Sequence, residues 1–90
     1  MNKATLRGPS AEVRWAYHRA ADLGPWTMTL LDTHGNVSMT AAVISSDAFR
    51  VSQQPLTLVV PRPNGNAWRW PIQSLQIAGS TLTASLGPQE

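Results

Sequence analysis

The 90-residue sequence contains no cysteine, which excludes disulfide bonds and metal sites built from thiolates. It contains only two histidines, His18 and His34, and their spacing is not that of a metal-binding pair. No apolar run approaches the roughly 20 residues that a membrane-spanning helix needs, so we expect no membrane partner. No hydrophobic stretch follows the single lysine near the start. We therefore expect no secretory signal and a cytoplasmic protein.

Motifs that mark common enzymes are also absent. The sequence has no G-x-S-x-G elbow, no H-E-x-x-H pair and no glycine-rich phosphate loop. Its five acidic residues are spread along the chain and do not suggest a catalytic carboxylate pair. We therefore predict that the protein is not an enzyme, and that it has no catalytic residue, cofactor, metal or small-molecule substrate.

Negative charge is missing from most of the second half of the chain. The formal net charge is only +2, but residues 48–89 contain no acidic residue. The same stretch carries Arg50, Arg62 and Arg69. An uncompensated positive field of this kind can attract an anionic partner, although three arginines are also common on the surface of ordinary domains.

Glycine and proline interrupt the sequence about every ten residues, the spacing of short strands joined by turns. Between these interruptions apolar residues alternate with threonine and serine, as in residues 26–30, 37–43 and 82–86. Such strands fit an antiparallel sheet that covers a core with one face. The sequence predicts an all-β fold in which residues 1–90 form one domain, a small antiparallel β-barrel or roll of five to seven short strands.

Two β-hairpins are predicted. In residues 25–44 a His-Gly-Asn sequence separates two alternating runs. In residues 55–72 an Asn-Gly dipeptide does the same, and this dipeptide favours a type I′ turn. Pro61 and Pro63 cannot donate to a strand ladder, so they confine that end of the hairpin to a sheet edge or to the turn.

Residues 10–23, SAEVRWAYHRAADL, have two interpretations. As a helix they begin with Ser10 as the N-cap and end at Gly24. As a strand they place Val13 and Trp15 on one face, and a turn follows. The regular alternation favours the strand, and one short helix near residues 10–23 is the alternative.

The segment NAWRWPIQSLQI, residues 66–77, has a tryptophan on either side of an arginine. Alternation places Trp68 and Trp70 on one face and Arg69 on the other. An inward pair of indoles buries on the order of 400 Å². At about 25 cal/mol per Å² this corresponds to roughly 10 kcal/mol, comparable with the net stability of a small domain. We therefore predict that both indoles fill the core. The apolar residues that follow have the opposite parity, which predicts a bulge within residues 71–74.

Three apolar residues are predicted on the outer faces of otherwise polar strands. Outward apolar residues that gather into a patch mark protein interfaces. Together with the arginines of the acid-free half, they make up the candidate partner-binding residues: Arg50, Arg62, Arg69, Leu31, Ile44 and Val59. The favoured interpretation is a protein that acts through protein–protein association, either with itself as an oligomer or with a protein partner in a larger assembly.

A single-stranded nucleic-acid-binding β-barrel is the alternative function. Such barrels stack bases on exposed aromatic rings and hold phosphates in a basic groove. The residues that could supply both are Trp15, Tyr17, Trp68, Trp70, Arg14, Arg50, Arg62 and Arg69. Alternation places the aromatic residues and the arginines on opposite faces of their strands, which suits a core and a surface better than one mixed patch.

Residues 49–88, FRVSQQPLTLVVPRPNGNAWRWPIQSLQIAGSTLTASLGP, resemble small proteins of unknown function encoded by tailed bacteriophages and prophages. The resemblance rests on SQQPLTLVVPR, WRWPIQSLQI and LTASLG. It implies a phage protein with a structural or accessory role, located in the host cytoplasm or in the virion. Because that family has no assigned activity, the resemblance implies no site residue.

Overall fold

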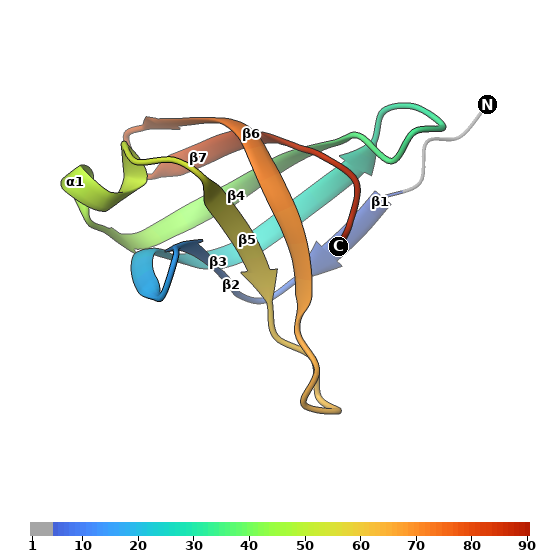
Figure 1. Cartoon of the computed structure of the whole chain (residues 1–90), viewed down its shortest axis with the longest axis horizontal. Coiled ribbons are helices and arrows are strands. Elements are labelled where there is room, and N and C mark those ends of the chain that lie inside the picture. The colour runs from blue at the N-terminus through green and yellow to red at the C-terminus, as the bar shows by residue number, and fades with distance from the viewer. Residues whose placement is uncertain (1–4) are drawn as a thin grey trace.

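The computed structural model describes residues 5–90, which form an all-β fold with one short helix (Figure 1). Six strands close into an antiparallel barrel, and a seventh strand extends one side of it. The all-β barrel predicted from the sequence is confirmed. In chain order the elements are β1 (Thr5–Gly8), β2 (Ala11–Trp15), β3 (His18–Leu30), β4 (Val37–Ser46), α1 (Ala48–Val51), β5 (Leu56–Val60), β6 (Trp68–Ala78) and β7 (Thr81–Leu86).

The barrel consists of two three-stranded meanders that meet along two seams. β2, β3 and β4 form the first meander, and β5, β6 and β7 form the second. The seams are the antiparallel pairs β2–β5 and β4–β7, which lie on opposite sides of the barrel. β1 pairs with the C-terminal half of β3. Within residues 5–90, no strand pairs with the other edge of β1.

Both predicted hairpins are confirmed, as β3–β4 and β5–β6. In the first, Gly35 has a φ of 92°, and the N–H of Leu31 donates to the carbonyl of Asn36 at 2.8 Å. In the second, Gly65 has a φ of 91°, and its N–H donates to the carbonyl of Arg62 at 3.1 Å.

The prediction of a type I′ turn in β5–β6 is wrong, because Asn64 does not have the positive φ that this turn needs. The hydrogen bond instead places Pro63 second and Gly65 fourth in the turn. A type I turn favours proline at its second position and glycine at its fourth. The predicted bulge is confirmed: the β6–β7 register shifts between Ile72 and Ser74. This shift lets both halves of β6 face the core.

β3 continues through Gly24 and Pro25, where the sequence pattern predicts a break. On one side of β3 these residues lie between the end of the β2 pairing, at Leu23, and the start of the β1 pairing, at Trp26. On the other side the β4 register shifts between the same two positions. Neither residue has to donate to a strand ladder, which explains why the strand tolerates proline there.

The helix alternative for residues 10–23 is wrong, and the strand interpretation is confirmed by β2. The strand ends at Trp15 because Ala16, with a φ of 54°, begins the turn into β3. The helix lies instead at α1, a single turn that follows Asp47. The side chain of Asp47 caps it by accepting a hydrogen bond from the backbone N–H of Arg50 at 3.0 Å. Residues 5–90 contain no helix with the length and hydropathy needed to cross a membrane.

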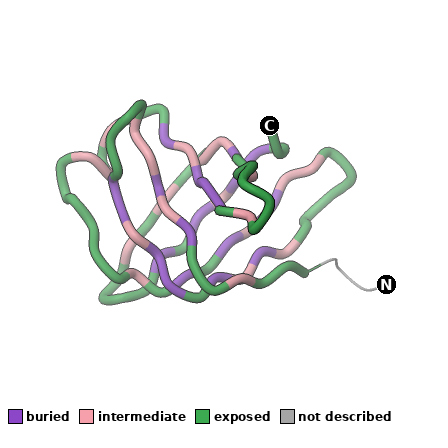
Figure 2. The backbone as a smooth tube through the Cα atoms, turned by 90° about the horizontal axis from the view of Figure 1, so that it is seen from below, coloured by how far each residue is buried: buried purple, intermediate pink, exposed green. Residues whose placement is uncertain are grey.

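Inward-facing side chains alternate along the strands and fill the barrel, as the buried segments in Figure 2 show. The largest fully buried side chains are Leu23, Met28, Met39, Leu58, Leu82, Leu86 and Val13. Trp70 is 4% exposed and belongs to this core, as predicted.

Trp68 faces the same way as Trp70, with ring centroids 6.3 Å apart, but it is only partly buried. The prediction of a fully interior indole is wrong for Trp68. This residue begins β6 and pairs with Val60, the last residue of β5, so it lies where the barrel ends and the hairpin extension begins.

The outer side of the β4–β7 seam carries uncharged hydroxyl side chains in cross-strand rows. One row runs through Thr27, Thr40, Thr83 and Gln76, and the next through Thr29, Ser38, Ser85 and Ser74. We call this surface the hydroxyl face. The strand segments that form it, residues 26–30, 37–46, 72–78 and 81–86, contain no charged residue.

Candidate functional site

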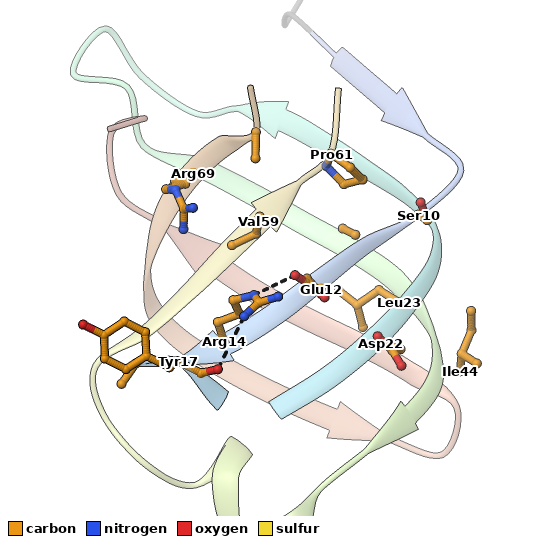
Figure 3. A pocket seen from close by; sticks show the side chains of 13 residues that line it. Ser10, Glu12, Arg14, Tyr17, Asp22, Leu23, Ile44, Val59, Pro61 and Arg69 are labelled. Carbon is orange, nitrogen blue, oxygen red and sulfur yellow. Dashed lines mark hydrogen bonds and ion pairs between the residues drawn. The ribbon is translucent and has the colours of Figure 1, made fainter. Parts of the chain in front are cut away.

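A hollow of about 710 Å³ lies on the outer side of the β2–β5 seam, across the barrel from the hydroxyl face (Figure 3). We call it the outer hollow. β2, β5 and β6 contribute the side chains that cross it, while the turn after β2 and one residue of β4 border it. It contains three of the predicted partner-binding residues: Ile44, Val59 and Arg69.

Four charged side chains form a connected ion-pair network beside this hollow. The Oε1 atom of Glu12 lies 2.6 Å from Nε of Arg14, and its Oε2 atom lies 3.0 Å from Nε of Arg19. Arg19 also lies 3.3 Å from a carboxylate oxygen of Asp22. Arg14 further donates to the backbone carbonyl of Tyr17 at 3.5 Å. The network balances two cations with two anions. Figure 3 shows Arg14 held across the hollow by Glu12 and by the backbone carbonyl of Tyr17.

Two large side chains stand exposed at opposite borders of the outer hollow (Figure 3). Tyr17 is 94% exposed, and Ile44 is 70% exposed. The turn that starts at Ala16 places Tyr17 outside the sheet, where no other aromatic ring of residues 5–90 packs against it. Ile44 is the outward apolar residue that the β4 pattern predicts.

Val59 is buried, with 6% exposure, and the prediction that it lies exposed is wrong. Its outward direction is right, because it is not part of the barrel core. Its cross-strand neighbours are Glu12 on β2 and Arg69 on β6. Figure 3 shows Val59 between these residues and Arg14. The aliphatic stems of such long side chains cover a short one between them. Val59 is therefore an apolar floor for the hollow.

The remaining candidate residues lie apart from one another. Arg69 lines the outer hollow and has no ion-pair partner within residues 5–90. Arg50 lies at α1, where it pairs with Asp47 at 3.8 Å and donates to a backbone carbonyl of β3. Leu31 is 50% exposed, in the turn between β3 and β4. Its distance from Ile44 along the hairpin is roughly 26 Å, at about 3.3 Å per residue.

Arg62 lies in the β5–β6 hairpin, with its guanidinium carbon 4.8 Å from the ring centroid of Trp68. This cation–π contact covers one face of the partly exposed indole. The side chains of Arg62 and Arg7 line a second hollow, of about 530 Å³, between β1 and the hairpin. Neither arginine has an ion-pair partner within residues 5–90.

The aromatic residues considered for base stacking do not share one face. Trp70 is in the core, and Tyr17 is in the turn after β2. Trp15 packs partly against the core and contacts Phe49 of α1 at 5.9 Å between ring centroids. Trp68 is the member of the group that lies beside an unpaired arginine.

The turn between β3 and β4 is held together by Asp32. Its carboxylate accepts hydrogen bonds from the backbone N–H groups of His34 and Asn36, and from the side-chain amide of Asn36 at 2.7 Å. These bonds, above all the one from the Asn36 side chain, lower the pKa of Asp32 below its ordinary value of 3.8. No group of three residues within 5–90 has the arrangement of a metal site.

Glu12 and Asp22 of the outer hollow were not predicted as site residues, and Arg14 and Tyr17 were predicted only for the nucleic-acid alternative. Glu12, Arg14 and Asp22 alternate with core residues and resemble any solvated strand face in the sequence. Tyr17 continues the alternation of Val13 and Trp15, so the pattern assigns it to the core side. The positive φ of Ala16 breaks that pattern, and alanine carries no sequence signal for such a conformation.

Comparison with known proteins found no family model, no curated protein and no solved structure that matches this chain. The geometry of the barrel and of its surface therefore carries the functional argument.

Proposed function

We propose that this protein is a non-enzymatic binding protein that associates with protein chains, as an oligomer or within a larger assembly, through the outer hollow. The observation that carries this proposal is the pair of exposed residues at its borders, Tyr17 and Ile44, which are 94% and 70% exposed. Large exposed side chains beside a concave surface supply the buried contact area that a protein interface needs.

The chemistry of the hollow also suits a protein partner. Its floor is apolar at Val59, and its charged border is largely self-compensated by the ion-pair network. Arg69 is left without an ion-pair partner among the described residues. An apolar centre, a polar border, and tyrosine and arginine at the edge are the usual composition of an interface. Because the network is already formed, partner binding would not have to order these side chains.

The resemblance to phage proteins supports the same proposal, because a small structural or accessory protein acts by assembling with other chains. Nucleic-acid binding has less support on this surface. Arg14 and Arg19 are paired with carboxylates, so few of its cations are free to neutralise phosphates. A protein in this role would act in the host cytoplasm or in the virion.

Sedimentation velocity across micromolar concentrations tests self-association, and a pull-down from host lysate tests association with another chain. The variant Ile44→Asp places a charge at the border of the outer hollow. We expect it to shift the sedimentation distribution toward the monomer, or to remove the captured partner, without lowering the thermal unfolding temperature. Ile44 is 70% exposed, so the barrel does not depend on it.

The matched control is Leu31→Asp, which makes the same change at an exposed apolar residue of the same hairpin, far from the hollow. It should leave association unchanged. The proposal is contradicted if the natural protein remains monomeric and the Ile44→Asp variant captures the same lysate proteins as the natural protein. Equal loss with Leu31→Asp would show that general surface hydrophobicity, and not the outer hollow, causes the association.

A further inference from the structure

A groove runs between β1 and the second meander, and it adjoins the outer hollow at Ser10 and Pro61. The hollow of about 530 Å³ between β1 and the β5–β6 hairpin forms one end of it. A hollow of about 300 Å³ between β1 and the C-terminal segment forms the other. Leu6 lines both, so the two hollows adjoin at this residue of β1. Figure 1 shows the C-terminal segment descending beside β1, and the hairpin extending away from the barrel.

The groove is lined mainly by apolar side chains. Trp26, Val60 and Trp68 line the hairpin end, together with three prolines. Met28, Leu30, Val37 and Trp70 line the other end. Leu6 is 50% exposed and Leu30 is 40% exposed, so apolar surface remains open to solvent along the groove.

Charge in the groove is positive and uncompensated. Arg7 and Arg62 line its hairpin end, and no acidic residue lines either hollow. The other arginines near carboxylates, Arg14, Arg19 and Arg50, are all in ion pairs. Glu12, Asp22 and Asp47 thus pair with cations elsewhere, and Arg7 and Arg62 have no such partner within residues 5–90. An occupant with a carboxylate near the hairpin end would complement them.

β1 forms one wall of the groove and provides backbone hydrogen-bonding groups there. It pairs with β3 along one edge, and no described strand pairs with its other edge. In an antiparallel pair, alternate residues of an edge strand point their N–H and C=O groups away from the partner. Exposed edges of this kind bind extended peptides by adding a strand.

We propose that this groove binds an extended peptide segment of a partner protein, in which apolar residues alternate with acidic ones. Roughly four to six residues would match the length of β1, at about 3.3 Å per residue. The segment adds along β1, places its apolar side chains beside Leu6 and Trp68, and directs a carboxylate toward Arg7 and Arg62. This site borders the outer hollow, but Tyr17 and Ile44, on which the proposed function depends, line neither part of it.

Single-stranded nucleic acid fits the groove less well. Trp26 is 4% exposed, and its indole Nε1 donates to the carbonyl of Ser10 at 2.7 Å, so its ring cannot stack on a base. One face of Trp68 is already covered by Arg62. Two arginines beside a mostly apolar lining favour one or two carboxylates over a chain of phosphates.

Selection from a random-peptide display library on the immobilised chain tests the proposal directly. We expect enrichment of peptides in which apolar residues alternate with aspartate or glutamate. A selected peptide, measured by fluorescence anisotropy, should lose about tenfold or more in affinity with Arg62→Glu and with Leu6→Glu. The control Arg50→Glu reverses an arginine that lines neither the groove nor the outer hollow, and should leave the affinity unchanged.

A charge swap gives a second readout. Replacing the acidic residues of the selected peptide by lysine should abolish binding to the natural chain and restore it to the Arg62→Glu variant. Failure to enrich any peptide, enrichment of peptides without acidic residues, or equal effects of Arg62→Glu and Arg50→Glu would overturn the proposal. So would tight, strongly salt-dependent binding of a thymidine oligonucleotide that competes with the peptide. None of these outcomes bears on Ile44, so the two proposed sites can fail separately.

Discussion

The hydroxyl face and the outer hollow lie on opposite seams of one barrel, and both alternate inward apolar residues with outward polar ones. On the hydroxyl face, around β4–β7, the outward positions are threonine and serine in straight cross-strand rows. Around β2–β5 they include the charged Glu12, Arg14 and Arg69 and the apolar Val59, which line a hollow. The inward pattern is the same in both regions, so the core does not account for the difference.

The inward side chains of the strands form one core, whereas their outward side chains differ between the two seams. Hydroxyl pairs across strands stabilise a sheet without attracting charged partners. Arginines, tyrosine and exposed apolar residues add little to a barrel but are enriched at interfaces. We therefore expect substitutions of inward and outward residues to change the stability of the barrel by different amounts.

Trp70→Ala should have the largest effect. The indole is 4% exposed in the core, and its removal leaves a cavity that costs about 3 to 5 kcal/mol of unfolding free energy, or prevents folding. Arg69→Ala, its neighbour on the opposite face, should change the stability by no more than about 0.5 kcal/mol. Urea unfolding followed by circular dichroism measures both values. Similar losses of unfolding free energy in the two variants would contradict the conclusion that inward side chains stabilise the barrel and outward ones do not.

Gly8→Ala should have an intermediate effect on the groove side. A Cβ atom at Gly8 would overlap the indole ring of Trp26, which is buried and hydrogen-bonded in place. Such overpacking costs about 1 to 3 kcal/mol. The control is Gly24→Ala, whose Cβ would have its nearest contacts at 3.7 Å, an ordinary van der Waals distance. Thermal unfolding of the two variants compares them, and an equal change would contradict close packing of β1 on Trp26.

Asn36→Ala should have the smallest effect, at the turn that joins β3 to β4. Without the side-chain amide, the pKa of Asp32 should rise toward its ordinary value of 3.8. Since the folded-state pKa is lowered, the carboxylate stabilises the turn above its unfolded-state pKa, and this contribution is lost as pH falls through the folded-state pKa. Titration of the Asp32 carboxyl by NMR measures the shift. Thr33→Ala, in the same turn, should leave it unchanged, and an unchanged pKa in Asn36→Ala would remove the proposed cause.

Alternation predicts most of the barrel because each inward residue must meet the same core. It locates both hairpins and the bulge between Ile72 and Ser74, where the apolar parity changes. The pattern wrongly predicts a break at Gly24 and Pro25. The sequence of β3 alone does not reveal that the neighbouring strands leave these two positions unpaired. It also misses β1, whose short length gives no period to detect.

The surface is less predictable than the core because it depends on cross-strand neighbours. Val59 is outward, as predicted, yet residues on two other strands cover it. Trp68 has the predicted direction but lies at the end of the barrel. The ion-pair network joins Glu12 and Arg19 across a turn, and no local motif marks that contact.

The two seams have a consequence for the half-formed chain. Separated from each other, the β2–β3–β4 and β5–β6–β7 meanders would each expose two bare strand edges, four in all. Bare edges recruit strands from other molecules and lead to aggregation. Closure covers all four together. Among the strands of residues 5–90 it leaves the short β1 edge without a strand partner, and this edge is flanked by Pro9 and carries Arg7. The risk of aggregation is thereby confined to the interval before the meanders dock.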